Sequence, residues 1–209
     1  LMACGVAVFR VLSKMSNKKL PQLANYVCGH SLGEYTAMTV AGVFSLSECA
    51  NLLRLRGKEM QIAVPLNKGA MAALIGVDII TTKKIIDNVV SIGVCNIAND
   101  NADGQVVISG DKLAVEKAIE ISKEYGVKRS VILPVSAPFH CSLMYPAQIK
   151  MEQALNDLSF ETPTVPIISN INALPEKDVT ILKQNLIDQV TGTVKWRETM
   201  ILADTLGVK

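Results

Sequence analysis

Apolar and polar positions change along the chain with the periods of helices and strands in turn. The opening apolar stretch is compatible with a helix, and residues 26–28 are a short apolar run before Gly29, as expected of a strand. Ser45 followed by Glu48 resembles a capping box, which predicts that a helix starts there. The helices expected in this part of the chain cover residues 2–14, 32–41 and 45–63.

Residues 67–134 have a pattern of their own, with the order strand, helix, strand, strand, helix, strand. This is the order of the split βαβ, or ferredoxin-like, arrangement. Residues 99–104 combine asparagine, aspartate and glycine, which predicts the turn between the two middle strands. We therefore expect a small subdomain over residues 67–134, inserted into a larger domain. Its expected strands cover residues 70–76, 93–98, 105–109 and 128–133, and its expected helices cover 81–90 and 111–125.

Strands alternate with helices on both sides of this insert, which favours an α/β fold with a mainly parallel sheet. The predicted core comprises residues 1–66 and 135–209. The sequence begins inside an apolar helix and stops after a helix, without the strand that the alternation would supply next, so we expect the core to be incomplete at both ends. After the insert, helices are expected at residues 146–158, 178–190 and 196–206, and a strand at 165–169.

Composition and charge exclude several classes of protein. Apolar residues make up 49% and charged residues 19%, as in soluble globular chains, and a net charge of +2 is too small to indicate nucleic-acid or membrane binding. No uncharged apolar run reaches the length of about 18 residues that a membrane-spanning helix needs. The opening stretch lacks a basic region and a clean cleavage site, so we do not expect it to be a secretory signal. The five scattered cysteines and two histidines argue against disulfides and a metal site, so we expect a cytoplasmic protein.

Residues 29–33 match the pattern G-x-S-x-G between an expected strand and an expected helix. Such a turn presents the Ser31 hydroxyl as a nucleophile, and Gly29 and Gly33 would let the two chain segments pack closely. The Leu32 N–H, at the start of the helix, would stabilise a developing oxyanion. The alternative is a chance match at an ordinary strand-to-helix turn.

A serine nucleophile needs a base, and the chain offers His30 and His140. His30 is adjacent to Ser31 on a tight turn, so its side chain should point elsewhere and support the turn. His140 lies downstream, at an expected helix start, which is the chain order of α/β-hydrolase-like sites. His140 is therefore the expected base, unless it only caps or packs. No acidic residue stands out as a third triad member, so a backbone carbonyl is an alternative partner for the imidazole.

Arg56 falls inside the apolar stripe of its expected helix, whereas Arg54 lies about 200° away around the helix. The stripe comprises Cys49, Leu52, Leu53, Met60 and Ala63. A buried guanidinium needs a partner, either an internal carboxylate or one from a ligand. A structural ion pair, or a side chain whose charged end reaches solvent, is the alternative. Together with a serine nucleophile, Arg56 indicates acyl transfer from a substrate with a free carboxylate.

Five ordered segments resemble the malonyl-CoA:acyl carrier protein transacylases of fatty acid biosynthesis, and the likeness covers essentially the whole chain. They are GHSLGEY at 29–35, RGKEMQ at 56–61, GAMAA at 69–73, GQVVISG at 104–110 and PVSAPFHCSLM at 134–144. The resemblance implies an α/β-hydrolase-like core with a ferredoxin-like subdomain. It also implies transfer of a malonyl group from malonyl-CoA to the phosphopantetheine thiol of acyl carrier protein.

The resemblance assigns roles to particular residues. Ser31 would carry the acyl ester, with His140 as general base and then acid, and Arg56 would bind the malonyl carboxylate. Gln189 would orient the histidine through its backbone carbonyl, and Phe139 would disfavour a branched acyl chain.

Two basic residues and the cofactor requirement also follow from the resemblance. Lys128 and Arg129 correspond to a basic pair that would help an acidic carrier protein to dock, although a plain solvated strand end is an equal alternative. No metal or tightly bound organic cofactor is implied, because CoA and phosphopantetheine are carriers of substrate.

The chain departs from the family pattern at both ends. Family members begin with a strand and a Gly-Gln-Gly-Ser/Ala-Gln loop whose last glutamine contributes to the oxyanion hole, and they carry a later Gly-Pro-Gly-Lys segment; neither is matched here. Two other functions therefore stay open at this point. One is a serine esterase or thioesterase, which would not explain Arg56, and the other is an inactive core or interaction remnant.

Overall fold

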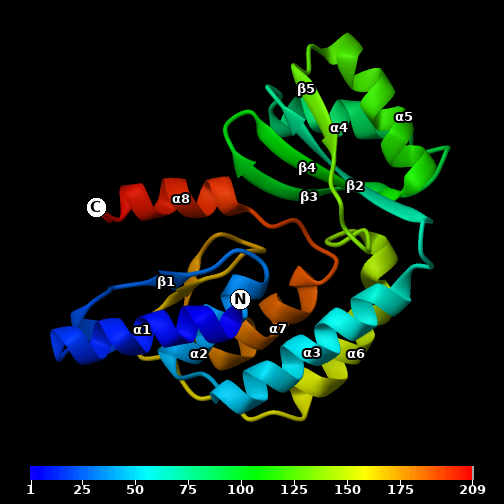
Figure 1. The fold of residues 1–209 in the computed structure, drawn as a ribbon. Helices are drawn as coiled ribbons and strands as arrows, with labels where there is room; N and C mark the ends of the chain where they lie inside the picture. The colour runs from blue at the N-terminus through cyan, green and yellow to red at the C-terminus, as the bar shows by residue number, and fades with distance from the viewer. Residues whose placement is uncertain (209) are drawn as a thin grey trace.

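The computed structural model describes residues 1–208, which form a mixed α/β fold with two separate sheets (Figure 1). One sheet has four strands and the other three, and helices cover both. Within residues 1–208, no helix is both long and apolar enough to cross a membrane. The same residues contain no cluster of three side chains able to hold a metal ion.

The four-stranded sheet is antiparallel, in the order β3-β4-β2-β5. Its strands are β2 (Gly69–Ile75), β3 (Cys95–Ala102), β4 (Gln105–Asp111) and β5 (Arg129–Ile132). Helices α4 (Ile79–Asp87) and α5 (Lys112–Ser122) cover one face, where their apolar residues pack on Ala72, Leu74 and Ile108. This confirms the predicted succession of strands and helices between residues 69 and 132, while the predicted domain boundaries stay a prediction.

The predicted turn at residues 99–104 is wrong in its extent. Strand β3 continues through Ala102, and the turn is confined to Asp103 and Gly104. The polar residues Asn99 and Asp100 stay in the strand because they have partners on both sides. They pair with Val107 and Val106 of β4, and Asp100 N–H also donates to the Val194 carbonyl at 3.0 Å.

The second sheet contains β1 (Val27–Cys28), β6 (Ile167–Ile168) and β7 (Pro175–Glu176). Strand β1 pairs with β6 in parallel, and β6 pairs with β7 in antiparallel fashion, so the predicted parallel arrangement holds for the first pair only. Strand β7 was not expected, since a two-residue strand that begins with a proline has little periodicity to reveal it.

Helices around this sheet form the larger hydrophobic core, and they follow the predicted ranges closely. They are α1 (Met2–Ser16), α2 (Leu32–Ala41), α3 (Leu46–Ala63), α6 (Tyr145–Asn156) and α7 (Val179–Gln189). Helices α3 and α6 pack side by side, and α1 packs on α2 (Figure 1). The capping box is confirmed: Glu48 N–H donates to Ser45 Oγ at 3.2 Å, and Ser45 N–H donates to Glu48 Oε2 at 2.7 Å.

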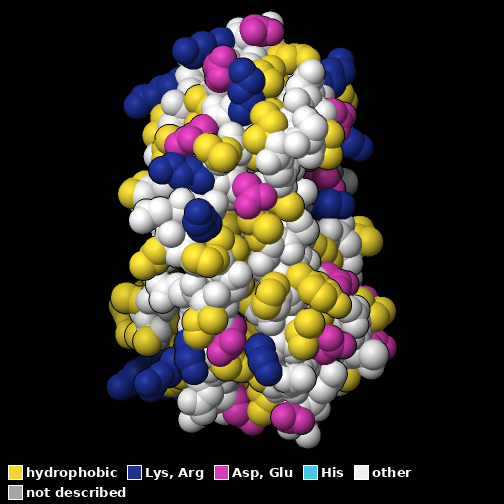
Figure 2. Space-filling view, turned by 90° about the vertical axis from the view of Figure 1, so that its right-hand side faces the viewer, with side chains coloured by type: hydrophobic (Ala, Val, Ile, Leu, Met, Phe, Trp, Pro, Cys, Tyr) yellow, Lys and Arg dark blue, Asp and Glu magenta, His cyan; other side chains and the backbone are white. Residues whose placement is uncertain are grey.

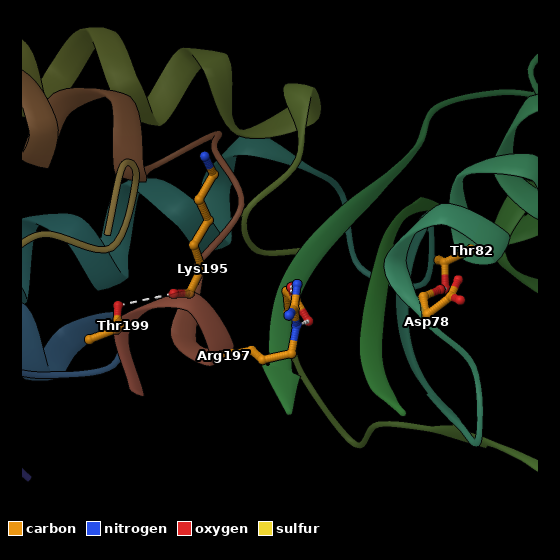
Figure 3. A network of polar contacts seen from close by, with 6 residues as sticks. Asp78, Thr82, Lys195, Arg197 and Thr199 are labelled. Carbon is orange, nitrogen blue, oxygen red and sulfur yellow. Dashed lines mark hydrogen bonds and ion pairs between the residues drawn. The ribbon is translucent and has the colours of Figure 1, made fainter. Parts of the chain in front are cut away.

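Residues 193–195 connect the two parts of the fold. The Val194 N–H donates to the Ala98 carbonyl at 2.9 Å, so this segment lies alongside β3. Helix α8 (Trp196–Thr205) follows, and Arg197 forms an ion pair with the buried Asp100 at 2.9 Å, reaching from α8 to β3 (Figure 3). Backbone and side-chain contacts together therefore fix the four-stranded sheet to residues 193–195 and to α8.

Candidate active site

Ser31 occupies the sharp turn between β1 and α2. Its backbone has φ 53° and ψ −108°, a conformation that non-glycine residues rarely adopt and that is typical of strained functional turns. At Gly29 a Cβ atom would clash with the backbone of Gly33, so the close approach requires glycine there. The corresponding prediction for Gly33 is wrong, because a Cβ at that position would meet none of the described atoms within 4 Å.

The structure brings His140 to Ser31. The Ser31 Oγ lies 2.8 Å from His140 Nε2, and His140 Nδ1 lies 2.8 Å from the backbone carbonyl of Gln189. Because a carbonyl can only accept, Nδ1 carries the proton and Nε2 presents its lone pair to the serine hydroxyl. This arrangement is a serine–histidine dyad oriented by a backbone carbonyl, the alternative to a triad that the sequence left open.

His140 does not lie at a helix start, contrary to prediction. It has φ 57°, and a short 3₁₀ turn at Ser142–Met144 separates it from α6, which begins at Tyr145. The strained backbone aims the imidazole at the nucleophile instead of into the helix. Burial, and secondarily the charge of Arg56, lower the pKa of His140 to about 3, so the ring is neutral at physiological pH.

Arg56 reaches the same point from α3. Its Nη2 donates to Ser31 Oγ at 3.0 Å and to Gln189 Oε1 at 3.1 Å, and its guanidinium lies over the Tyr35 ring, 5.7 Å from the centroid. The side chain is 8% exposed, which confirms its predicted burial, whereas Arg54 is exposed. Among residues 1–208 no carboxylate lies within 4.0 Å of the guanidinium, so the internal ion pair considered above does not form.

Arg56 retains unused hydrogen-bonding capacity. Its Nε is buried without a partner. Burial lowers the pKa of the guanidinium, and the nearby Tyr35 and Glu34 partly offset this effect. Since an arginine side chain stays protonated in proteins, the site contains a buried cation whose planar fork can still receive an anion.

Asn170 is a site residue that the sequence analysis missed. It lies in the connection after β6, and its Oδ1 accepts the Ser31 N–H at 2.6 Å. Its Nδ2 donates to the Gly29 carbonyl at 2.8 Å, so one side chain holds the turn on both sides of the nucleophile. The available signal was its position just after the predicted strand at residues 165–169, because the ends of parallel strands gather site residues.

Glu34 was missed as well, although it follows Ser31 by only three residues. It is 0% exposed on α2, and its Oε2 accepts from Gln189 Nε2 at 2.7 Å and from Asn170 N–H at 3.2 Å. Burial raises the pKa of this carboxyl to about 7, partly countered by those two hydrogen bonds. An acid in the first turn of an apolar helix is common for electrostatic reasons, so the pattern alone did not mark it.

Leu32 and Phe139 also adjoin the catalytic dyad. Leu32 is the first residue of α2, and no acceptor for its N–H is found among the described residues, as is usual for the first turn of a helix. It lines a cavity of about 460 Å³ together with Gly29 and His30. Phe139 is partly buried and packs against the hydrophobic clusters of both sheets.

The side chains of the remaining predicted residues make no hydrogen bond to the Ser31 or His140 side chains. His30 Nε2 is 2.9 Å from Asn101 Oδ1, so this histidine contacts the four-stranded sheet and not the serine hydroxyl. Lys128 and Arg129 are exposed where β5 begins, beside Ile75. That is the opposite end of β2 from Gly69, which packs near Pro138, and a strand of this length spans about 20 Å.

Comparisons with known proteins show which family the chain belongs to. The acyl transferase domain family model matches residues 2–205. The malonyl CoA-acyl carrier protein transacylase of Escherichia coli K12 is 38% identical over the whole chain, which spans 66% of that relative's length.

Solved structures also resemble this chain in both sequence and fold. An acyl-carrier-protein-S-malonyltransferase from Bartonella henselae is 46% identical with a TM-score of 0.93, over 99% of this chain and 66% of that one. A malonyl-transacylase solved in complex with a type II PKS acyl-carrier protein is 37% identical with a TM-score of 0.94, over 99% and 66% of the two chains. By its sequence and its structure, this chain belongs to the acyl transferase domain family.

Proposed function

We propose that this site transfers a malonyl group from malonyl-CoA to the phosphopantetheine thiol of acyl carrier protein, through an ester on Ser31. The observation that carries the proposal is the buried Arg56 guanidinium, 3.0 Å from the nucleophilic oxygen and without an internal carboxylate in the described chain. A dicarboxylic acyl group such as malonyl would pair its free carboxylate with Arg56 while its thioester carbon lies at Ser31. The names of the relatives and structures compared above support the same substrate.

In the first half-reaction, His140 Nε2 accepts the Ser31 hydroxyl proton while Oγ attacks the thioester carbon. The resulting oxyanion accepts from the Leu32 N–H, and the malonyl carboxylate lies on Arg56. The carbon–sulfur bond then breaks, and the leaving CoA thiolate takes the proton from His140. The products of this step are malonyl-Ser31 and free CoA.

In the second half-reaction, the phosphopantetheine thiol replaces CoA. His140 takes the thiol proton, the sulfur attacks the ester carbon, and the carbon–oxygen bond to Ser31 breaks. The serine oxygen recovers its proton from His140. The proposed steps use only side chains and backbone groups of this chain, with no bound metal or organic cofactor, and Phe139 would disfavour branched acyl groups.

We also propose that the chain combines a ferredoxin-like subdomain with an α/β-hydrolase-like core. The strand order β3-β4-β2-β5, with βαββαβ connections, supports a ferredoxin-like subdomain over residues 67–134. The serine turn between β1 and α2 supports an α/β-hydrolase-like core over the flanking residues. A cytoplasmic location is the setting in which this chemistry would operate.

Docking of an acidic carrier protein would use basic side chains on the surface of this chain. On the face drawn in Figure 2, lysine and arginine side chains are interspersed with acidic ones and do not gather in a single patch. Lys128 and Arg129 remain our candidates for docking. They lie at the start of β5, at the far end of the sheet, so they would act through long-range attraction.

Mass spectrometry after incubation with malonyl-CoA tests the proposal. We expect one malonyl adduct on Ser31 in the parent chain and none in Ser31→Ala. Addition of phosphopantetheinylated carrier protein should then discharge the adduct and yield malonyl-carrier protein. Free malonate as the main product would instead indicate a hydrolase, and the absence of any adduct would overturn the proposed activity for this chain.

A further inference from the structure

Glu34 is a completely buried carboxyl group that no ion pair explains. Burying a carboxyl group without an ion pair costs free energy, so we expect its contacts to have a structural or functional role. Within the described chain no lysine or arginine nitrogen lies within 4.0 Å of it. Its partners are instead two amide donors, one on Gln189 and one on Asn170.

The contact with Gln189 determines how that side-chain amide is oriented. Gln189 Nε2 donates to Glu34 Oε2 at 2.7 Å, which directs Oε1 toward Arg56, at 3.1 Å from Nη2. The other acceptors of Nε2 are more distant, at 3.2 Å for the Ser31 carbonyl and 3.4 Å for Asn170 Oδ1. Without the carboxyl oxygen the amide could rotate and face the guanidinium with its own donor.

The contact with Asn170 acts on the other side of the site. Its backbone N–H donates to Glu34 Oε2 at 3.2 Å, while its side chain bonds both Gly29 and the Ser31 N–H. The same carboxyl oxygen therefore anchors the two residues that hold the nucleophile turn and the base. Gln189 contacts both Arg56 and the base: its side chain accepts from Arg56, and its backbone carbonyl accepts from His140 Nδ1.

We propose that Glu34 is a positioning residue: one oxygen of its carboxyl group fixes Gln189 and Asn170, and through them the mutual placement of Ser31, His140 and Arg56. As far as it concerns malonyl transfer, this inference rests on the proposed function. The hydrogen-bond geometry on which it is built does not.

Positioning requires an acceptor oxygen and not a charge. Because Oε2 already receives two donors, a proton on Glu34 would lie on Oε1, which is buried without a hydrogen-bond partner. The unpartnered Ser169 hydroxyl lies close to the carboxyl group, and its oxygen would then accept a hydrogen bond from the protonated Oε1. Both protonation states keep Oε2 as the acceptor. Glutamine at this position reproduces the neutral state.

The test compares Glu34→Met with Glu34→Gln by the rate of malonyl adduct formation on Ser31. Methionine fills the volume without an acceptor, and we expect the rate to fall about 100-fold, as for a small misplacement of reacting groups. Glu34→Gln should stay near the parent rate, as should the exposed control Glu116→Met. Should Glu34→Met fail to fold, Glu34→Asp, whose shorter side chain withdraws the acceptor, takes its place with an intermediate loss.

A second readout separates this inference from the proposed function. Long-range ¹H–¹⁵N NMR spectra of the His140 imidazole report its tautomer without any substrate. We expect one tautomer, protonated on Nδ1, in the parent and Glu34→Gln, and a mixture in Glu34→Met. A folded Glu34→Met with the parent spectrum and parent rate would overturn the positioning role. A parent chain that forms no adduct but shows the expected tautomers would overturn the proposed function alone.

Discussion

The buried carboxyl group of Glu34 makes a quantitative prediction about stability. Burial raises its pKa from the ordinary value of 4.5 to about 7 in the folded chain. Between these two values the folded state holds a proton that the unfolded state has released. The contribution of this group to stability is therefore fully present below about pH 4.5 and is lost as the pH rises through 7.

The size of this loss follows from the two pKa values. At 1.36 kcal/mol per pKa unit, the interval from 4.5 to about 7 corresponds to about 3 kcal/mol. Glu34→Gln removes the titration and keeps the acceptor oxygen. We therefore expect the stability of Glu34→Gln, relative to the parent chain, to increase by about 3 kcal/mol between pH 4 and pH 8.

Urea unfolding followed by far-UV circular dichroism measures this difference at several pH values. Other titrating groups, including His140, are present in both proteins, so their contributions largely cancel. Glu116→Gln, the same substitution at an exposed position, is the control. A difference between Glu34→Gln and the parent that stays constant with pH would mean that the carboxyl group titrates alike in both states, and the reasoning from burial would be refuted.

Three further predictions concern other parts of the molecule. Arg56→Ala should lower kcat/KM for malonyl transfer about 100- to 1000-fold, because two charged hydrogen bonds to the malonyl carboxylate are lost. The kcat/KM for acetyl transfer should fall far less. Equal losses with both donors in steady-state assays would reject the carboxylate role. Gly29→Ala should abolish adduct formation, because its Cβ would clash with the Gly33 backbone; normal labelling by mass spectrometry would contradict this. Arg197→Met should lower the free energy of unfolding by about 2 kcal/mol in urea titrations, since Asp100 is left buried and unpaired, and an unchanged value would show that the pair contributes nothing.

Local signals were enough to predict the helices and the chemical core of the site. The Ser45 capping box located the start of α3, and the helical period then placed Arg56 on the buried face. The G-x-S-x-G pattern identified Ser31, and at Gly29 the close approach of the Gly33 backbone requires the glycine. Elimination was sufficient for His140, since only two histidines exist.

The remaining features depend on contacts between distant parts of the chain. Asn170 is 139 residues from Ser31, and Glu34 is 155 residues from Gln189, so no local pattern connects them. Strand β3 extends beyond its prediction because Val194 supplies a partner to Asp100 from another region. Polar residues that look like a turn in isolation become strand residues when the fold satisfies their hydrogen bonds.

The attachment of residues 193–195 to β3 has a mechanical consequence for the base. Val194 is bonded to β3 only five residues after Gln189, whose carbonyl orients His140, and five residues span at most about 17 Å. Gly192 N–H donates to the Asp188 carbonyl at 2.9 Å, so this short segment is held in a turn and is not free to extend. The four-stranded sheet therefore cannot tilt away from α7 without breaking its bonds to Val194 or pulling the carbonyl off the imidazole.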